Sequence, residues 1–181
     1  MKIVLMAKVF LVVGLPGSGK STHARRLAIE HHALRLTPDD WMIPLFGEPE
    51  GEGKRDVLEG RFITLALQLV RLGTNMVLDF GFWSREERLS LRWLFEREGA
   101  EIELVYLAVD RTTQLARIGS RWNDSPHATF PITAAELDHW RAHFDTPDAA
   151  ELSGFEPSEP PLPWTSWLAW AEDRWPSLST D

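Results

Sequence analysis

A glycine-rich segment near the start of the chain constrains the fold more than any other feature. Residues 14–22 read GLPGSGKST and directly follow the apolar run Val9–Val13. The segment matches G-x-x-x-x-G-K-[ST] between a strand and a helical pattern, which is the context expected of a loop that binds phosphate groups. A glycine turn that only joined a strand to a helix would give the Lys-Ser pair no packing role. The segment therefore predicts a loop that binds a nucleoside triphosphate.

Each residue type in this loop suits the binding of phosphate oxygens. The glycines permit backbone conformations in which successive N–H groups converge on one anion. Lys20 brings a positive charge to the outer phosphates, and Ser21 offers a hydroxyl ligand to Mg²⁺. The helix that starts near Gly19 directs its positive end at the same anion. The predicted nucleotide-binding residues, for ATP or GTP with Mg²⁺, are Gly14, Leu15, Pro16, Gly17, Ser18, Gly19, Lys20, Ser21 and Thr22.

Apolar runs alternate with helical patterns over the rest of the chain. Strands are predicted at 9–13, 34–36, 76–78 and 102–109, and helices at 22–32, 54–72, 84–99, 112–120 and 133–143. Two of these helices open with capping boxes, at Ser84 and at Thr133. Such alternation predicts an α/β protein of three layers, α/β/α, with the P-loop NTPase fold and a parallel sheet of four to five strands.

Two segments interrupt this alternation. Residues 43–53 combine prolines, glycines and glutamates, which predicts a loop near the ligand-binding edge of the sheet. Residues 155–175 mix prolines with tryptophans, and the near-helical spacing of Trp164, Trp167 and Trp170 predicts a short helix docked on the domain. An interaction motif is the alternative interpretation of these tryptophans.

Composition narrows the class of ligand. The chain has 181 residues, a formal net charge of −8 and no cysteine, which fits one well-buried domain without disulfides or thiolate metal sites. A long polyanion would require a basic stripe, so nucleic acid is disfavoured as a partner. No leader or membrane-spanning pattern is visible, and we expect a cytoplasmic monomer. The arginines are scattered over helix faces that we expect to be solvated: Arg25, Arg26, Arg71, Arg85, Arg88, Arg92 and Arg97.

Three aspartates are candidates for chemistry beyond the loop. Asp39 and Asp40 follow the strand at 34–36, at the sheet edge where open α/β folds bind ligands. A carboxylate there can accept the proton of an attacking hydroxyl. Asp39 is the preferred candidate, although either residue could instead cap the next helix. Asp79 follows the strand at 76–78 and is predicted to hold Mg²⁺ through water, with a turn role as the alternative.

Arginines and aromatic residues complete the candidate site. Arg117 and Arg121 lie four residues apart on one predicted helix, so both can project from one face and neutralise charge on a triphosphate. Trp41, Phe82 and Trp83 neighbour the candidate aspartates in sequence and could stack on a ring of the acceptor. For any single tryptophan a core position is the favoured interpretation, whereas the rings taken together favour at least one contact with the acceptor.

The order of these motifs resembles a known family. GLPGSGKST, then PDD with Asp39 nineteen residues after Lys20, then VLDFGFWSREER and QLARIGSRW are similar to the small P-loop kinases. That family includes polynucleotide 5′-kinases, chloramphenicol 3-O-phosphotransferases and zeta toxins, and the resemblance covers roughly 8–144. It implies that Asp39 activates the acceptor hydroxyl, that Asp79 with Arg88 matches the third-strand aspartate and its following helix, and that Arg117 and Arg121 cover the nucleotide. The expected organisation is a P-loop kinase domain at 1–150, a lid around 111–130, and a tail at 151–181 packed on the same domain.

One position departs from the family pattern. The polynucleotide kinases carry an arginine two residues after the Asp-Asp pair, where it grips a phosphate of the acceptor, and here that position is Met42. A methionine cannot bind phosphate, so we expect an acceptor without a phosphate beside its reactive hydroxyl. The predicted catalytic residues are Asp39, Lys20 and Arg121. The predicted acceptor-binding residues are Asp39, Asp40, Trp41, Met42, Asp79, Phe82 and Trp83.

The sequence thus predicts an ATP-dependent phosphotransferase that moves the γ-phosphate to a hydroxyl of a small molecule of antibiotic, nucleoside or sugar type. A nucleic-acid 5′-hydroxyl kinase is the first alternative, and it would need a basic groove that the sequence does not show. The second alternative is a nucleotide-dependent switch or slow ATPase without a transfer substrate.

Overall fold

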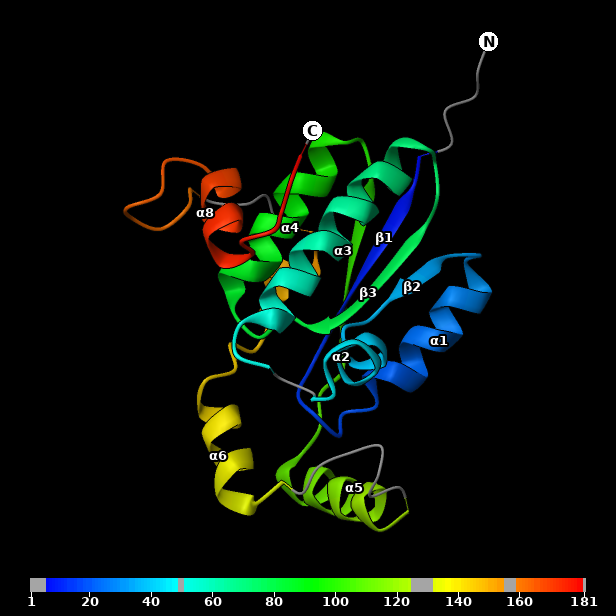
Figure 1. The fold of residues 1–181 in the computed structure, drawn as a ribbon, viewed down its shortest axis with the longest axis vertical. Coiled ribbons are helices and arrows are strands. Elements are labelled where there is room, and N and C mark those ends of the chain that lie inside the picture. Colours follow the sequence, from blue (N-terminus) through cyan, green and yellow to red (C-terminus); the bar gives the residue numbers. More distant parts are fainter. Residues whose placement is uncertain (1–5, 49–50, 125–131, 155–158, 181) are drawn as a thin grey trace.

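A parallel sheet forms the centre of the protein (Figure 1). The structure is a computed structural model that describes residues 6–48, 51–124, 132–154 and 159–180. Within these residues the sheet has four strands, β1 (Lys8–Val13), β2 (Leu34–Leu36), β3 (Met76–Gly81) and β4 (Glu101–Tyr106). Their order is β2-β3-β1-β4, and every neighbouring pair is parallel. The predicted parallel sheet is therefore confirmed.

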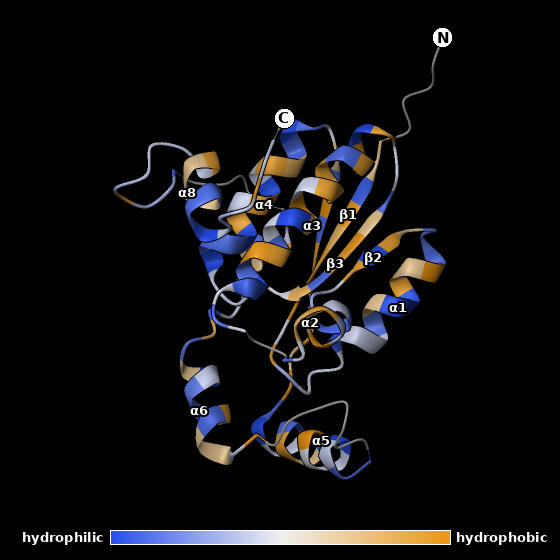
Figure 2. Ribbon diagram, in the orientation of Figure 1, coloured by the Kyte–Doolittle hydropathy of each residue, from blue (hydrophilic) through white to orange (hydrophobic). Residues whose placement is uncertain are grey.

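Helices cover both faces of this sheet, which confirms the three-layer α/β/α fold. Helices α3 (Lys54–Arg71) and α4 (Arg85–Arg97) pack on one face and α1 (Lys20–Glu30) packs on the other (Figure 1). Because β1 and β3 lie between the two helical layers, their side chains are apolar on both faces, as the hydropathy colouring shows (Figure 2).

Successive residues of β1 separate the two halves of the core. Val9, Leu11 and Val13 belong to the larger apolar cluster with α3 and α4, whereas Phe10 and Val12 belong to a smaller cluster with α1. This follows from the alternation of side chains along a strand. From Val9 to Val13 the strand therefore needs no polar position, and these five residues form a continuous apolar run.

Three predicted boundaries are wrong. The strand that was predicted at 76–78 continues to Gly81, and the one predicted to reach 109 ends at Tyr106. Residues 43–46, predicted as loop, form the second half of α2 (Asp39–Phe46), with Pro44 inside the helix. Pro44 removes one backbone hydrogen bond from the helix. The complete burial of Met42 in the core stabilises α2 by packing and outweighs this loss.

The C-terminal half of the chain extends the domain in two directions. Helices α5 (Arg111–Asp124) and α6 (Ala134–Ala142) lie beyond the carboxyl edge of the strands, and α8 (Trp167–Arg174) lies beside α4 (Figure 1). The short α7 (Ala149–Leu152) contacts β4. The predicted docked helix is present, although it begins at Trp167 and not at Trp164. Residues 125–130 of the predicted lid and 155–158 of the predicted tail lie outside the described residues.

None of the helices in the described ranges has both the length and the apolar character that crossing a bilayer requires.

Two arginines that we expected to be solvated are instead buried on α4. Arg88 and Arg92 are 2% and 6% exposed. The Nε and Nη2 groups of Arg88 donate to the carboxylate of Glu151 on α7 at 2.8 and 3.1 Å, and its Nη1 donates to the carbonyl oxygens of Phe82 and Trp83. The arginine thus joins α4 to α7 and fixes the chain that leaves β3. Sequence periodicity could not reveal this pair, because the partners are far apart in the chain.

Replacing Glu151 by Gln should destabilise the protein strongly, because it leaves the charge of Arg88 buried without a counter-ion. We expect a loss of about 3–5 kcal/mol in the free energy of unfolding, measured by urea denaturation at pH 7. Asp138→Asn is the control, since it breaks the exposed pair of Asp138 with Arg111 and should cost below about 1 kcal/mol. Equal losses in the two variants would contradict a structural role of the buried pair.

Candidate active site

The glycine loop packs tightly against the ends of two strands. Gly14 has φ +151°, and its N–H donates to the carbonyl oxygen of Gly81 at 3.2 Å. A Cβ atom on Gly14 would lie 2.8 Å from the carbonyl oxygen of Leu107 and 2.8 Å from Ser18 Oγ. A side chain at this position therefore has no room, in addition to the strained backbone angle.

The loop offers several hydrogen-bond donors suited to an anion. Helix α1 begins at Lys20 after Gly19, which has φ +97°, and the N–H groups of its first turn have no carbonyl acceptor within the helix. Ser18 Oγ is buried and has no hydrogen-bond partner among the described residues. A buried hydroxyl is normally paired, so this loop suits the oxygens of a bound phosphate chain.

The ammonium group of Lys20 lies in the middle of the candidate site. Its Nζ donates to the carbonyl oxygen of Leu15 at 3.0 Å. Burial lowers its pKa to about 8, opposed by the negative charges of Asp79 and Asp39 and assisted by the positive charges of Arg55 and Arg121. Four charged groups from separate elements therefore act on Lys20, and three of them, Asp39, Asp79 and Arg121, are predicted site residues.

Asp79 occupies an interior position of β3 and is almost completely buried. Its Oδ2 accepts bonds from Nε and Nη2 of Arg35 on β2, at 3.1 and 2.8 Å. Arg35 also donates to Asp40 Oδ2 at 2.7 Å, so it links β3 to the start of α2. The carboxylate donor set of Asp79 fits a Mg²⁺ ion bound through water, although one of its oxygens is already used by Arg35.

Asp39 is the first residue of α2, and its side chain is 54% exposed. Both terminal nitrogens of Arg55 on α3 lie 3.0 Å from Asp39 Oδ1. Neither Asp39 nor Asp40 caps the helix, because the N-cap position is Pro38 and no side chain accepts a cap hydrogen bond there. The capping alternative is therefore wrong.

Helix α5 packs directly on the glycine loop. Gln114 Nε2 donates to the carbonyl oxygen of Pro16 at 2.7 Å, and Arg117 Nη1 lies 3.2 and 3.3 Å from the carbonyl oxygens of Gly17 and Ser18. Arg121 is exposed one turn further along the helix. Both arginines lie on the helix beside the loop, as their spacing suggested.

The remaining acceptor-binding candidates divide into buried and exposed residues. Met42 has no exposed surface, and Phe82 is 3% exposed at φ +41°. Both side chains belong to the core, so in this structure they do not line the site. Trp41 is 48% exposed and packs edge-on against Phe62, and Trp83 is half-buried with its ring 6.0 Å from that of Trp140 on α6. Only the two tryptophans present surface to a ligand.

Sequence analysis missed two functional residues, Arg35 and Arg55. Arg35 is a cation in the middle of a three-residue strand, a signal that could have been noticed. Arg55 gives no such signal, because nothing in the sequence indicates that the start of α3 faces the start of α2. The methionine at position 42 suggested that no cation near Asp39 could bind a phosphate of the acceptor. The guanidinium of Arg55 lies beside Asp39, so this inference from Met42 no longer follows.

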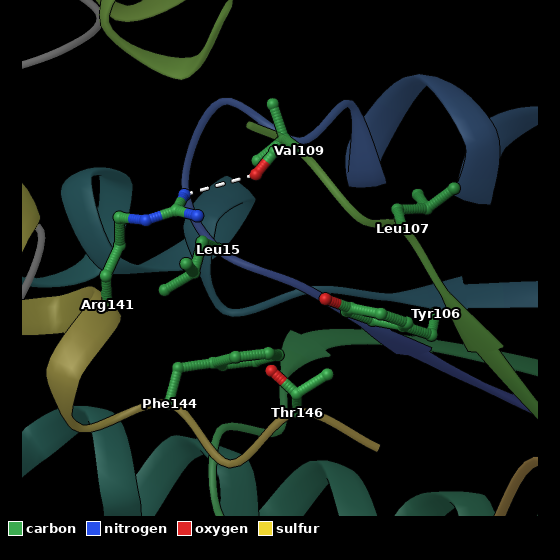
Figure 3. A pocket seen from close by; sticks show the side chains of 7 residues that line it. All are labelled: Leu15, Tyr106, Leu107, Val109, Arg141, Phe144 and Thr146. Atoms are coloured by element: carbon green, nitrogen blue, oxygen red, sulfur yellow. Dashed lines mark hydrogen bonds between the residues drawn. The ribbon is translucent and has the colours of Figure 1, made fainter. Parts of the chain in front are cut away.

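A small recess, with a cavity volume of about 60 Å³, opens next to the loop (Figure 3). Leu15 lines one side, and the rings of Tyr106 and Phe144 lie nearly parallel, with centroids 6.0 Å apart. Arg141 Nη1 donates to the carbonyl oxygen of Val109 and to Gln114 Oε1, at 3.1 and 2.7 Å. These two bonds connect α6 to α5 and to the segment before it, and they hold the wall of the recess.

The fold and the glycine loop together define a P-loop protein of the α/β/α class. The chain belongs to the family described as AAA domain, whose model matches residues 9–147. This match agrees with the P-loop fold that the glycine loop and the motif order predicted. A comparison with curated proteins gives no match.

Several solved structures share this fold. A chain in the structure of the Pnkp1/Rnl/Hen1 complex has a TM-score of 0.56 and 22% identity, covering 62% of this chain and 39% of that one. A protein from Chloroflexus aurantiacus, provisionally described as a kinase, has a TM-score of 0.64 and 16% identity, with 80% of both chains covered. A sugar kinase from a Janibacter species has a TM-score of 0.53 and 18% identity, with 80% of both chains covered. At these identities the likeness establishes the fold alone.

Binding of a triphosphate should raise the pKa of Lys20, because the phosphate charges favour its ammonium form. At pH 8 the free protein carries this proton on about half of the molecules, given a pKa of about 8. Binding should then take up about half a proton, which calorimetry in buffers of different ionisation enthalpy can measure. Lys20→Arg is the control, because arginine stays charged and should bind without this uptake. An identical uptake in both proteins would contradict the assignment to Lys20.

Proposed function

We propose that this protein is an ATP-dependent phosphotransferase that moves the γ-phosphate to a hydroxyl group of a small molecule. The supporting observation is that Asp39, Asp79, Arg55 and Arg121, from four separate elements, act electrostatically on the ammonium of Lys20, while Arg55 also lies 3.0 Å from Asp39. A carboxylate that can take a proton and cations that can stabilise transferring phosphate are the groups that phosphoryl transfer requires.

In the proposed reaction, the acceptor oxygen attacks the γ-phosphorus while the bond to the bridging oxygen breaks and ADP leaves. Asp39 accepts the hydroxyl proton, and Lys20 stabilises the negative charge on the phosphate oxygens. Arg121, with Arg117 beside the loop, neutralises charge on the departing diphosphate. Mg²⁺, when bound, supplies further charge neutralisation, with Ser21 and Asp79 as the residues that would hold it.

The acceptor that we propose is a small hydroxylated molecule of antibiotic, nucleoside or sugar type. The net charge of −8 disfavours a long polyanion. The exposed ring of Trp41 and the half-buried ring of Trp83 suit a ligand with a planar or sugar ring. A 5′-hydroxyl of nucleic acid is the second candidate, and Arg55 beside Asp39 favours it, because a guanidinium there could bind an acceptor phosphate.

We further propose that the recess beside Leu15 receives the base of the nucleotide. The recess lies next to the loop. It suits a flat aromatic group, because it is lined by the nearly parallel rings of Tyr106 and Phe144 and by the guanidinium of Arg141.

Asp39→Asn should abolish transfer while leaving nucleotide affinity nearly unchanged, because the amide cannot accept the hydroxyl proton. A screen with radiolabelled ATP against hydroxylated metabolites, nucleosides, antibiotics and 5′-hydroxyl oligonucleotides would identify the acceptor. We expect at least about 100-fold slower transfer in the variant, with Asp138→Asn, which changes an exposed aspartate paired with Arg111, as the matched control. Wild-type transfer by Asp39→Asn would sink the proposed mechanism, and label only on oligonucleotides would favour the second candidate.

Phe144→Ala should weaken ATP binding by about 5- to 10-fold, because it removes a stacking surface for the base. The same variant should bind inorganic tripolyphosphate as tightly as the wild type, since the glycine loop is unchanged. Calorimetric titration with the two ligands measures both affinities. A parallel loss for both ligands would argue against a base site in the recess.

A further inference from the structure

The carboxylate of Asp39 is held from outside its own helix. Its 54% exposed side chain extends from the first turn of α2 to Arg55, whose Nη1 and Nη2 both lie 3.0 Å from Oδ1. An exposed aspartate without such a contact samples several rotamers. The contact with Arg55 therefore selects one orientation of the group to which we assign proton transfer.

Arg55 is itself fixed by a buried residue one helical turn away. Its Nε donates to Glu59 Oε1 at 3.1 Å, and the side chain of Glu59 is 7% exposed. A buried carboxylate is costly unless its oxygens accept hydrogen bonds from charged or polar donors. The hydrogen bond from Arg55 therefore stabilises the buried carboxylate of Glu59 and holds the arginine in place. The two terminal nitrogens of Arg55 contact Asp39.

The second oxygen of Glu59 is bound by the C-terminal segment. Trp175, completely buried, donates from its indole Nε1 to Glu59 Oε2 at 3.0 Å. Arg174 Nη2 lies 3.9 Å from the same oxygen, and its other bonds go to Asp56 and to Glu87. The end of α8 therefore closes the pocket in which Glu59 is buried.

The segment after α8 lies close against α3 at this point. A Cβ atom on Gly60 would come within 2.5 Å of Ser177 Oγ and 2.9 Å of the backbone nitrogen of Leu178. Arg61 Nη1 also donates to the carbonyl oxygen of Ser177 at 3.2 Å. The residue after Glu59 must be glycine for the C-terminal segment to reach its place.

We propose that Arg55 is a positioning residue that orients the carboxylate of Asp39, and that the C-terminal segment fixes Arg55 through Glu59 and Trp175. This inference rests on the proposed function, because it gives a catalytic consequence to the orientation of Asp39. A long arginine side chain loses much conformational entropy when it is held in one orientation. The hydrogen bond to the buried carboxylate of Glu59 compensates for this loss. Misplacement of a catalytic group by about 1 Å can cost about 100-fold in rate.

Protonation of Glu59 should weaken this chain of contacts. Burial raises the pKa of Glu59 to about 7, opposed by Arg55, Arg174 and Trp175 and assisted by the charge of Glu87. A group with a raised pKa takes up its proton as the pH falls through that value, and neutral Glu59 attracts Arg55 less strongly. The rate of transfer by the wild type should therefore decline as the pH falls below about 7. The pH profile of Glu59→Gln should lack this decline, because its amide does not titrate.

The kinetic test compares variants along the chain of contacts. Arg55→Gln, Glu59→Gln and Trp175→Phe should each lower kcat by about 10- to 100-fold with the KM for ATP within about twofold of the wild type. Arg55→Lys should recover part of kcat, because it restores a cation beside Asp39. Lys54→Gln is the matched control, since Lys54 pairs with Glu48, and it should retain wild-type kcat. Wild-type kcat in Arg55→Gln would overturn the proposal.

A structural measurement separates this inference from the proposed function. In protein labelled with ¹³C-aspartate, the carboxyl signal of Asp39 should shift or broaden in Trp175→Phe and in Gly60→Ala. It should not change in Trp93→Phe, which alters a half-buried tryptophan on α4 whose ring contacts Arg97. An unchanged Asp39 signal in Trp175→Phe, with the fold intact by thermal unfolding, would overturn the coupling. Failure to find any acceptor would instead count against the proposed function.

Discussion

The close packing of Gly14 between the ends of β3 and β4 is the constraint on which the rest of the site depends. The hydrogen bond from Gly14 to Gly81 fixes the start of the loop on one side, and the carbonyl oxygen of Leu107 leaves no room for a side chain on the other. Because these strands are neighbours of β1 in a parallel sheet, their carboxyl ends meet at one edge. The loop, the ends of β2 and β3 and helix α5 are thereby brought around one ammonium group.

Ion pairs between distant segments organise the surroundings of this edge. Arg35 joins Asp79 to Asp40, Arg55 joins Asp39 to Glu59, and Arg88 joins the chain after β3 to Glu151. In each case one arginine presents several donors to two different elements, which lysine could not do with the same geometry. Such ion pairs, whether buried or partly exposed, add little net stability, but they specify which segments meet. Here they set the positions of the two helices that flank the candidate site.

The tryptophan-rich C-terminal segment is part of the same arrangement. Trp167, Trp170 and Trp175 bury their rings against α4 and one another, so the apolar character of the segment is explained by packing. The polar edge of Trp175 points at Glu59. The segment thus completes the burial of Glu59, which is connected to Asp39 through Arg55.

The sequence by itself determined the fold class, the phosphate loop, both capping boxes and the sheet edge at which Asp39 and Asp79 lie. These depend on local signals: periodicity, glycine spacing and residues that follow a strand. Only the tertiary structure decided that Met42 and Phe82 are core residues, that α2 continues through Pro44, and that Arg88 is buried. It alone decided that Arg55 faces Asp39. These features arise from contacts between segments that are distant in the chain, for which local sequence carries no periodic or compositional signal.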